Sequence, residues 1–179
     1  MTGLTEATRT WDSFDEFVHA RSVALWRSAW LLTGDTQRAE DLVQEALGRC
    51  WGKFDRLNRA GNSFEAYVRT AIYHAYLSWW RAGTWREGTM PAGNPEPARH
   101  DSVADRDLLR ALAALPRQQR AVVVLRYFED RSTAEAADLL RISQGAVKTH
   151  LHRALSSLRS SHHLRTQDLS YLPKEDDRS

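Results

Sequence analysis

Two adjacent helical patterns within residues 132–158 restrict the folds that this chain can adopt more than any other feature of the sequence. The first pattern begins with Ser132-Thr133-Ala134-Glu135, a capping box in which the Ser oxygen and the Glu carboxylate each accept a hydrogen bond from a free amide at the helix start. The helix that follows, Thr133–Leu140, contains Ala136 and Ala137, and such small residues let a second helix cross closely. The segment is therefore predicted to begin with a short helix that packs tightly against a neighbour.

A second helix is predicted after the short turn Leu140–Ser143, with Ser143 as its N-cap. One face of this helix is apolar, and the opposite face carries hydrogen-bonding and basic side chains without an acidic residue, as a helix in the DNA major groove requires. Lysine and arginine can reach phosphates or guanine edges, and glutamine and threonine can reach bases. The residues predicted to contact DNA are Ser143, Gln144, Lys148, Thr149, His152 and Arg153.

The distribution of charge supports this helix-turn-helix better than the total charge does, because the formal net charge is only +2. Residues 141–165 contain five basic residues and no acidic one, whereas residues 166–179 contain four acidic and two basic ones. An ordinary helical hairpin with a solvated basic face is the alternative, since amphipathic helices are common. Arg141 breaks one rule, because it stands where a glycine would suit a left-handed turn, at a cost of up to about 1 kcal/mol.

Helical periodicity also dominates the first part of the chain, where apolar residues recur at spacings of three and four. Gly34 breaks this pattern, and Asp35 is predicted to cap a helix over Arg38–Phe54. A polar loop is then expected over Asp55–Ser63, and a third long helix from about Phe64 to Trp80.

Residues 83–102 have the composition of a linker, with several glycines and prolines and few aliphatic residues. A second helical block begins near Val103, and Ala121–Leu125 within it is predicted to be a buried helix rather than a strand. The expected fold is therefore all-α, with two small helical domains joined by a flexible linker and a helix-turn-helix in the C-terminal domain. The expected parts are domains at 11–82 and 103–164, the linker at 83–102 and a polar tail at 165–179.

The third long helix combines aromatic residues with nearby arginines: Phe64, Tyr67, Tyr73, Tyr76, Trp79 and Trp80 with Arg69, Arg81 and Arg86. Unpaired bases stack on aromatic rings and guanidinium groups, at about 1–3 kcal/mol per base. A helix of this length cannot expose all of these rings, so about half are expected in the core. The residues predicted to point outward and contact opened DNA are Arg69, Tyr73, His74, Trp80 and Arg81.

Five segments, taken in order, resemble the extracytoplasmic-function sigma factors, a group of the sigma-70 family of RNA polymerase subunits. Ala39–Ala46 is similar to the helix of the second-region domain that docks on the polymerase clamp. Tyr67–Arg69, with Trp79–Arg81, is similar to the promoter-melting helix of an actinobacterial subgroup. Leu115–Phe128 and Gly145–Leu155 resemble the fourth-region domain.

The resemblance covers about residues 11–160 and implies an alternative sigma factor that binds core RNA polymerase and initiates transcription at promoters. It implies that the recognition helix reads the −35 element, and that the aromatic helix and the loop Asp55–Ser63 open and hold the −10 element. Asp41, Gln44 and Glu45 share one helix face. By itself, such a face would be exposed to solvent without a partner. The resemblance implies that it contacts the clamp coiled coil of the largest polymerase subunit. The polymerase flap and an anti-sigma factor are further partners of such a protein, and residues 83–102 would thread the RNA exit path.

The chain departs from the usual residues of the family at four positions. His74 replaces a frequent Asn and Ser78 a frequent Asp in the melting helix, while Ala146 replaces a frequent Thr and His150 a frequent Arg in the recognition helix. The resemblance therefore does not carry a promoter sequence over to this chain.

Two other classes of protein fit parts of the sequence. A self-sufficient helix-turn-helix regulator would need a dimer interface, and the aromatic helix and the clamp-like helix argue against it. A helical module that only binds other proteins is opposed by the basic recognition face.

No enzymatic, metal-binding or cofactor-binding motif is found, and we expect none of these activities. Cys50 is the only cysteine, which excludes an intramolecular disulfide and a cysteine-based zinc site within one chain and fits a reducing cytoplasm. His150 and His152 are two residues apart on a helix and point in different directions. The apolar stretch Val23–Leu32 contains Arg27 and is too short to span a bilayer, so we expect a cytoplasmic protein without membrane insertion.

Overall fold

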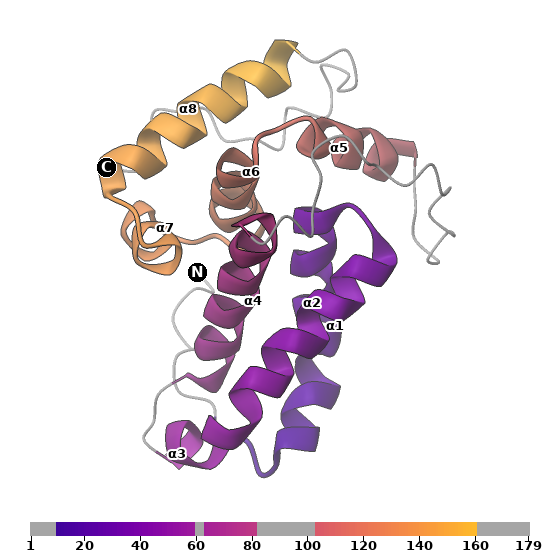
Figure 1. Ribbon diagram of the computed structural model, residues 1–179, viewed down its shortest axis with the longest axis vertical. Helices are drawn as coiled ribbons and strands as arrows, with labels where there is room; N and C mark the ends of the chain where they lie inside the picture. The colour runs from indigo at the N-terminus through magenta and orange to yellow at the C-terminus, as the bar shows by residue number, and fades with distance from the viewer. Residues whose placement is uncertain (1–9, 60–62, 82–102, 161–179) are drawn as a thin grey trace, which may run out of the picture. The chain divides into compact units, whose positions relative to one another are not determined.

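The computed structural model describes residues 10–59, 63–81 and 103–160, and the regular elements in these ranges are all helical (Figure 1). The predicted all-α fold class is therefore confirmed. The chain divides into two compact units, Met1–Thr89 and Met90–Ser179. The first contains α1 (Phe14–Thr33), α2 (Thr36–Cys50), the 3-10 helix η1 (Trp51–Lys53), α3 (Phe54–Arg59) and α4 (Phe64–Arg81). The second contains α5 (Val103–Ala113), α6 (Arg117–Val123), the π-helix η2 (Val124–Phe128), α7 (Thr133–Leu140) and α8 (Gln144–Ser160).

Helix α2 is the centre of the first unit, since it packs against both α1 and α4. The boundary between α1 and α2 lies at Gly34, which was predicted to break the helical pattern, and at Asp35, which was predicted to cap the next helix. Gly34 adopts a left-handed conformation with φ 70° and donates its backbone N–H to Trp30 O, which ends α1. The Asp35 side chain then accepts a hydrogen bond of 2.8 Å from the Arg38 amide, which starts α2.

The polar segment after α2 is more helical than predicted. Helix α2 ends at Cys50 rather than at Phe54, and residues 55–59 of the expected loop belong to α3. Phe54 is buried and packs edge-on against Phe64, with 5.0 Å between the ring centroids. Asn58 donates to Trp11 O at 2.6 Å and accepts from the Trp11 amide at 2.9 Å. These long-range contacts stabilise a helix that the polar composition does not favour.

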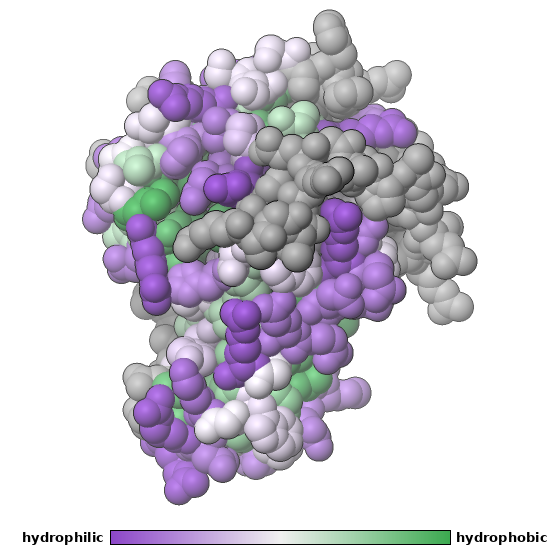
Figure 2. Space-filling model, viewed as in Figure 1, coloured by the Kyte–Doolittle hydropathy of each residue, from purple (hydrophilic) through white to green (hydrophobic). Residues whose placement is uncertain are grey.

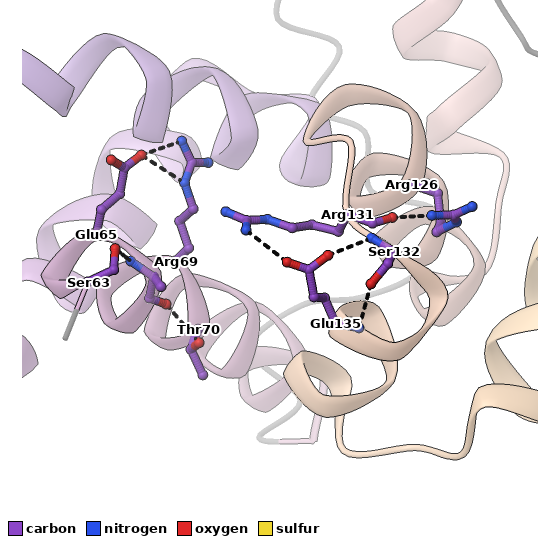
Figure 3. A network of polar contacts seen from close by, with 9 residues as sticks. Ser63, Glu65, Arg69, Thr70, Arg126, Arg131, Ser132 and Glu135 are labelled. Atoms are coloured by element: carbon purple, nitrogen blue, oxygen red, sulfur yellow. Dashed lines mark hydrogen bonds and ion pairs between the residues drawn. The ribbon is translucent and has the colours of Figure 1, made fainter. Parts of the chain in front are cut away.

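A buried ion-pair network joins α1 to α4, and Figure 3 shows its Glu65–Arg69 pair within α4. The Glu65 carboxylate pairs with Arg21 of α1 at 2.8 Å and with Arg69 of α4 at 2.8 Å. Arg69 also donates to the Ser28 hydroxyl at 3.2 Å. The side chains of Glu65 and Arg69 are only 12% and 13% exposed, so this network belongs to the interior of the unit.

In the second unit, α6 and α7 both pack against α8. Residues 121–125 are buried and helical, which confirms the preference for a helix over a strand there. Helices α7 and α8 pack against each other, and Leu140 of α7 and Val147 and Leu155 of α8 are buried. Among the described residues, none of the helices is long and apolar enough to cross a membrane.

Candidate nucleic-acid interface

The capping box at the start of α7 forms as predicted (Figure 3). The Glu135 amide donates to Ser132 Oγ at 3.1 Å, and the Ser132 amide donates to Glu135 Oε2 at 2.7 Å. Arg131 lies 3.4 Å from the same carboxylate. The hydrogen bonds from Ser132, with a smaller contribution from Arg131, lower the pKa of Glu135. The first helix of the helix-turn-helix is thus fixed at its N-terminus by its own sequence.

The turn between α7 and α8 contains the left-handed residue that the sequence suggested. Arg141 has φ 53° and ψ 47°. The Ile142 amide donates to Ala137 O at 3.1 Å and the Arg141 amide to Asp138 O at 3.3 Å, so α7 ends in a Schellman motif. The chain then reverses into Ser143, whose hydroxyl accepts a hydrogen bond of 3.1 Å from the Ala146 amide and caps α8.

Helix α8 divides into the two predicted faces. Val147, Ala154, Leu155 and Leu158 are buried. The six residues predicted to contact DNA are all exposed: Ser143, Gln144, Lys148, Thr149, His152 and Arg153. Within the described part of the chain, no carboxylate pairs with Lys148 or Arg153. The face is therefore polar, basic and exposed, and its contact with DNA stays a prediction.

The aromatic helix α4 differs from the prediction at two positions. Tyr73 is fully buried, so the prediction that it points outward is wrong. Arg69 turns inward to Glu65 and Ser28 rather than toward solvent. Since α4 contacts α1, α2 and α3, it buries a wider face than a helix covered from one side, and both residues lie on that face. His74 is half-buried, and the side chains of Trp80 and Arg81 lie outside the described residues.

The face of α2 predicted to bind polymerase is only partly free. Asp41 and Gln44 are exposed, whereas Glu45 is half-buried. Glu45 accepts a hydrogen bond of 2.6 Å from the indole N–H of Trp79 in α4 and also pairs with Arg49. This link could not be predicted from the sequence, because no local pattern connects residues 34 positions apart.

The surface has few other candidates for a site. Figure 2 shows mostly hydrophilic residues on the coloured part of the surface, with hydrophobic side chains visible in small areas. Three large apolar side chains are exposed among the described residues, namely Val23, Trp51 and Phe128. The part of the chain that the structure describes contains no group of histidine, cysteine, aspartate and glutamate residues that could hold a metal ion. Cys50 is buried, and burial raises the pKa of its thiol to about 11.

Comparison with known proteins gives this arrangement its family. Residues 17–86 match the family model for sigma-70 region 2, and residues 105–158 match that for sigma-70 region 4. The RNA polymerase sigma-E factor of Streptomyces coelicolor is 39% identical over 168 residues, which cover 91% of this chain and 93% of that protein. The ECF RNA polymerase sigma factor SigL of Mycobacterium tuberculosis is 36% identical over 145 residues, which cover 77% of this chain and 82% of SigL.

A solved structure agrees with these relatives. The sigma factor RpoE of Bartonella quintana, in complex with the anti-sigma factor NepR, superposes with a TM-score of 0.66 at 25% identity, covering 82% of this chain and 94% of RpoE. The chain therefore belongs to the extracytoplasmic-function group of the sigma-70 family of RNA polymerase sigma factors.

Proposed function

We propose that this protein is an alternative sigma factor, which binds core RNA polymerase, recognises −35 and −10 promoter elements and initiates transcription of a specific gene set. The observation that carries the proposal is the polar, basic and exposed face of α8, which lies in the same chain as a region 2 unit. A regulator that acts without polymerase would not need the N-terminal region 2 unit.

The −35 element is assigned to the C-terminal unit, about residues 103–164. Lys148 and Arg153 project from the exposed face of α8 without an acidic partner among the described residues, so they are available for phosphates or guanine edges. Gln144 and Thr149 lie near the N-terminal end of the same helix, where base edges are read in helix-turn-helix proteins. Ser143 and His152 complete the proposed contact surface.

The −10 element is assigned to the N-terminal unit, about residues 11–82. With Tyr73 in the core and Arg69 in the ion-pair network, the proposal narrows to His74, Trp80 and Arg81. A histidine, an indole and a guanidinium group can each stack on an extruded base. Residues 83–102 are proposed to connect the two units as a linker.

The polymerase contact is assigned to α2. Asp41 and Gln44 are exposed one turn apart, and Glu45 lies beside them with its carboxylate bound to Trp79. Acidic and amide side chains on one helix face suit the clamp coiled coil of the largest polymerase subunit, and the flap is the second proposed contact on the enzyme.

The protein is proposed to act in the cytoplasm as a non-catalytic subunit without cofactor or metal. An anti-sigma factor is a further proposed partner. The Bartonella quintana relative supports this partner, because its structure was determined in complex with one.

The proposal is tested by reconstitution with core RNA polymerase. A library of templates with randomised −35 and −10 regions is transcribed, and the templates that yield RNA define the promoter. We expect Lys148→Ala and Arg153→Ala to lower transcription from that promoter while core binding stays at the wild-type level, because both side chains face DNA. Asp41→Ala combined with Gln44→Ala is expected to weaken core binding.

Arg159→Ala is the matched control, since Arg159 is exposed in the last turn of α8 and far from its N-terminal end. Equal losses of core binding and promoter use in every variant would indicate misfolding and would not support the proposal. A chain that shifts duplex DNA alone as a dimer and never stimulates core polymerase would establish the stand-alone regulator instead.

A further inference from the structure

Arg141 combines an unfavourable backbone conformation with a side chain that has no partner among the described residues. Its φ of 53° and ψ of 47° lie in the left-handed region, which costs a residue with a Cβ atom about 1 kcal/mol or more compared with glycine. The Schellman motif that ends α7 uses only its backbone amide, and glycine is the usual residue at that position. Neither the turn nor the helix end therefore needs an arginine side chain.

The guanidinium group has no structural role within the described part of the chain. The Arg141 side chain is exposed and forms no ion pair or hydrogen bond with a described residue. The arginines of the interior behave differently, since Arg21 and Arg69 both pair with Glu65. A strained position that keeps an unpaired, fully charged side chain points to a use outside the fold.

The location of Arg141 indicates what that use is. It precedes the N-cap Ser143 by two residues, so it lies beside the end of α8 that carries Gln144. It is also the first residue of a segment, 141–160, that contains no acidic side chain. Asp138, three residues earlier in α7, is exposed, but none of the ion pairs among the described residues involves Arg141. An exposed arginine next to a recognition helix, followed by a segment without acidic residues, is suited to a DNA phosphate at the edge of the groove.

We propose that Arg141 is a phosphate-binding residue that anchors the N-terminal end of the recognition helix on the DNA backbone, and that the strained turn is kept for this contact. The inference rests on the proposed assignment of α8 to the −35 element. It adds a positioning residue to that surface, because a phosphate contact fixes the register of the helix without reading a base.

The test measures the affinity of the reconstituted holoenzyme for its selected promoter as a function of salt concentration. Neutralising one phosphate contributes about 0.9 to the slope of log K against log salt, which amounts to about fivefold in affinity between 1 M and 0.15 M salt. We expect Arg141→Gly to lower the slope by about 0.9 and the affinity at 0.15 M salt about fivefold. The thermal midpoint of this variant should not fall below that of wild type, since glycine relieves the strain.

Two further variants separate charge from backbone conformation. Arg141→Asn tolerates the left-handed region but lacks the charge, so it is expected to behave like Arg141→Gly. Arg141→Lys keeps the charge and should restore most of the salt slope, because lysine binds phosphate as a point charge. Arg159→Gln removes one charge about 22 Å further along α8 and is expected to leave the slope unchanged.

A wild-type slope in Arg141→Gly would overturn the inference, as would an equal loss in Arg159→Gln or a failure of Arg141→Lys to restore the slope. A fall in the thermal midpoint of Arg141→Gly would also overturn it, because Arg141 would then be a structural residue. Lys148→Ala distinguishes a failure of the Arg141 inference from a failure of the proposed function. If Lys148→Ala weakens promoter binding and Arg141→Gly does not, only the inference fails, whereas a holoenzyme that selects no promoter contradicts the proposed function.

Discussion

Glu135 illustrates how a single carboxylate holds the start of the helix-turn-helix. Its pKa lies below the ordinary value of 4.5, mainly because it accepts hydrogen bonds from Ser132. A depressed pKa in the folded state means that the ionised carboxylate stabilises the fold. This stabilisation is fully present above the ordinary pKa and is lost as the pH falls through the lower, folded value.

The pH dependence of Glu135→Gln tests this interpretation. We expect the stability difference between wild type and Glu135→Gln to be constant above about pH 5 and to shrink as the pH falls below 4.5, the ordinary pKa of this side chain. Thermal unfolding of the full chain, followed by circular dichroism between pH 7 and pH 3, measures the difference. Asp138→Asn removes an exposed carboxylate from the same helix and is the control. The capping interpretation fails if both variants give the same pH profile.

Among the helices, local patterns predicted the elements whose ends depend on nearby residues. Asp35 and Ser132 cap the helices they were expected to cap, and the two faces of α8 follow from its own periodicity. The errors concern distant contacts. Tyr73 is buried, and residues 55–59 are helical rather than a loop, because other helices pack there. The local sequence contains no sign of either contact.

The ion pairs of Glu65 lead to a prediction about the stability of the N-terminal unit. Glu65→Gln removes the negative charge between Arg21 and Arg69, and breaking such a buried pair costs about 3 kcal/mol. We expect the urea midpoint of the N-terminal unit in the full chain to fall accordingly. Glu40→Gln, an exposed position on α2, should have no such effect. If Glu65→Gln instead leaves stability intact and impairs promoter opening alone, Arg69 acts on DNA and the structural interpretation is wrong.

At the scale of the whole molecule, the order of the region 2 and region 4 segments indicates the function better than any one segment does. The basic face of α8 alone is compatible with a hairpin or with a stand-alone regulator. The matches to regions 2 and 4 in one chain support the proposal that this face is one half of a two-part promoter contact. Two contacts on one template act together through their effective concentration, so each unit can bind weakly and the pair tightly.

The most direct test of this account is run-off transcription by core RNA polymerase from the selected promoter, with and without the protein. The account predicts a transcript of defined start only when the protein is present, and its loss when either the −35 or the −10 element is replaced. Transcription that survives replacement of either element, or tight promoter binding by the protein without polymerase and no stimulation of the enzyme, would contradict it.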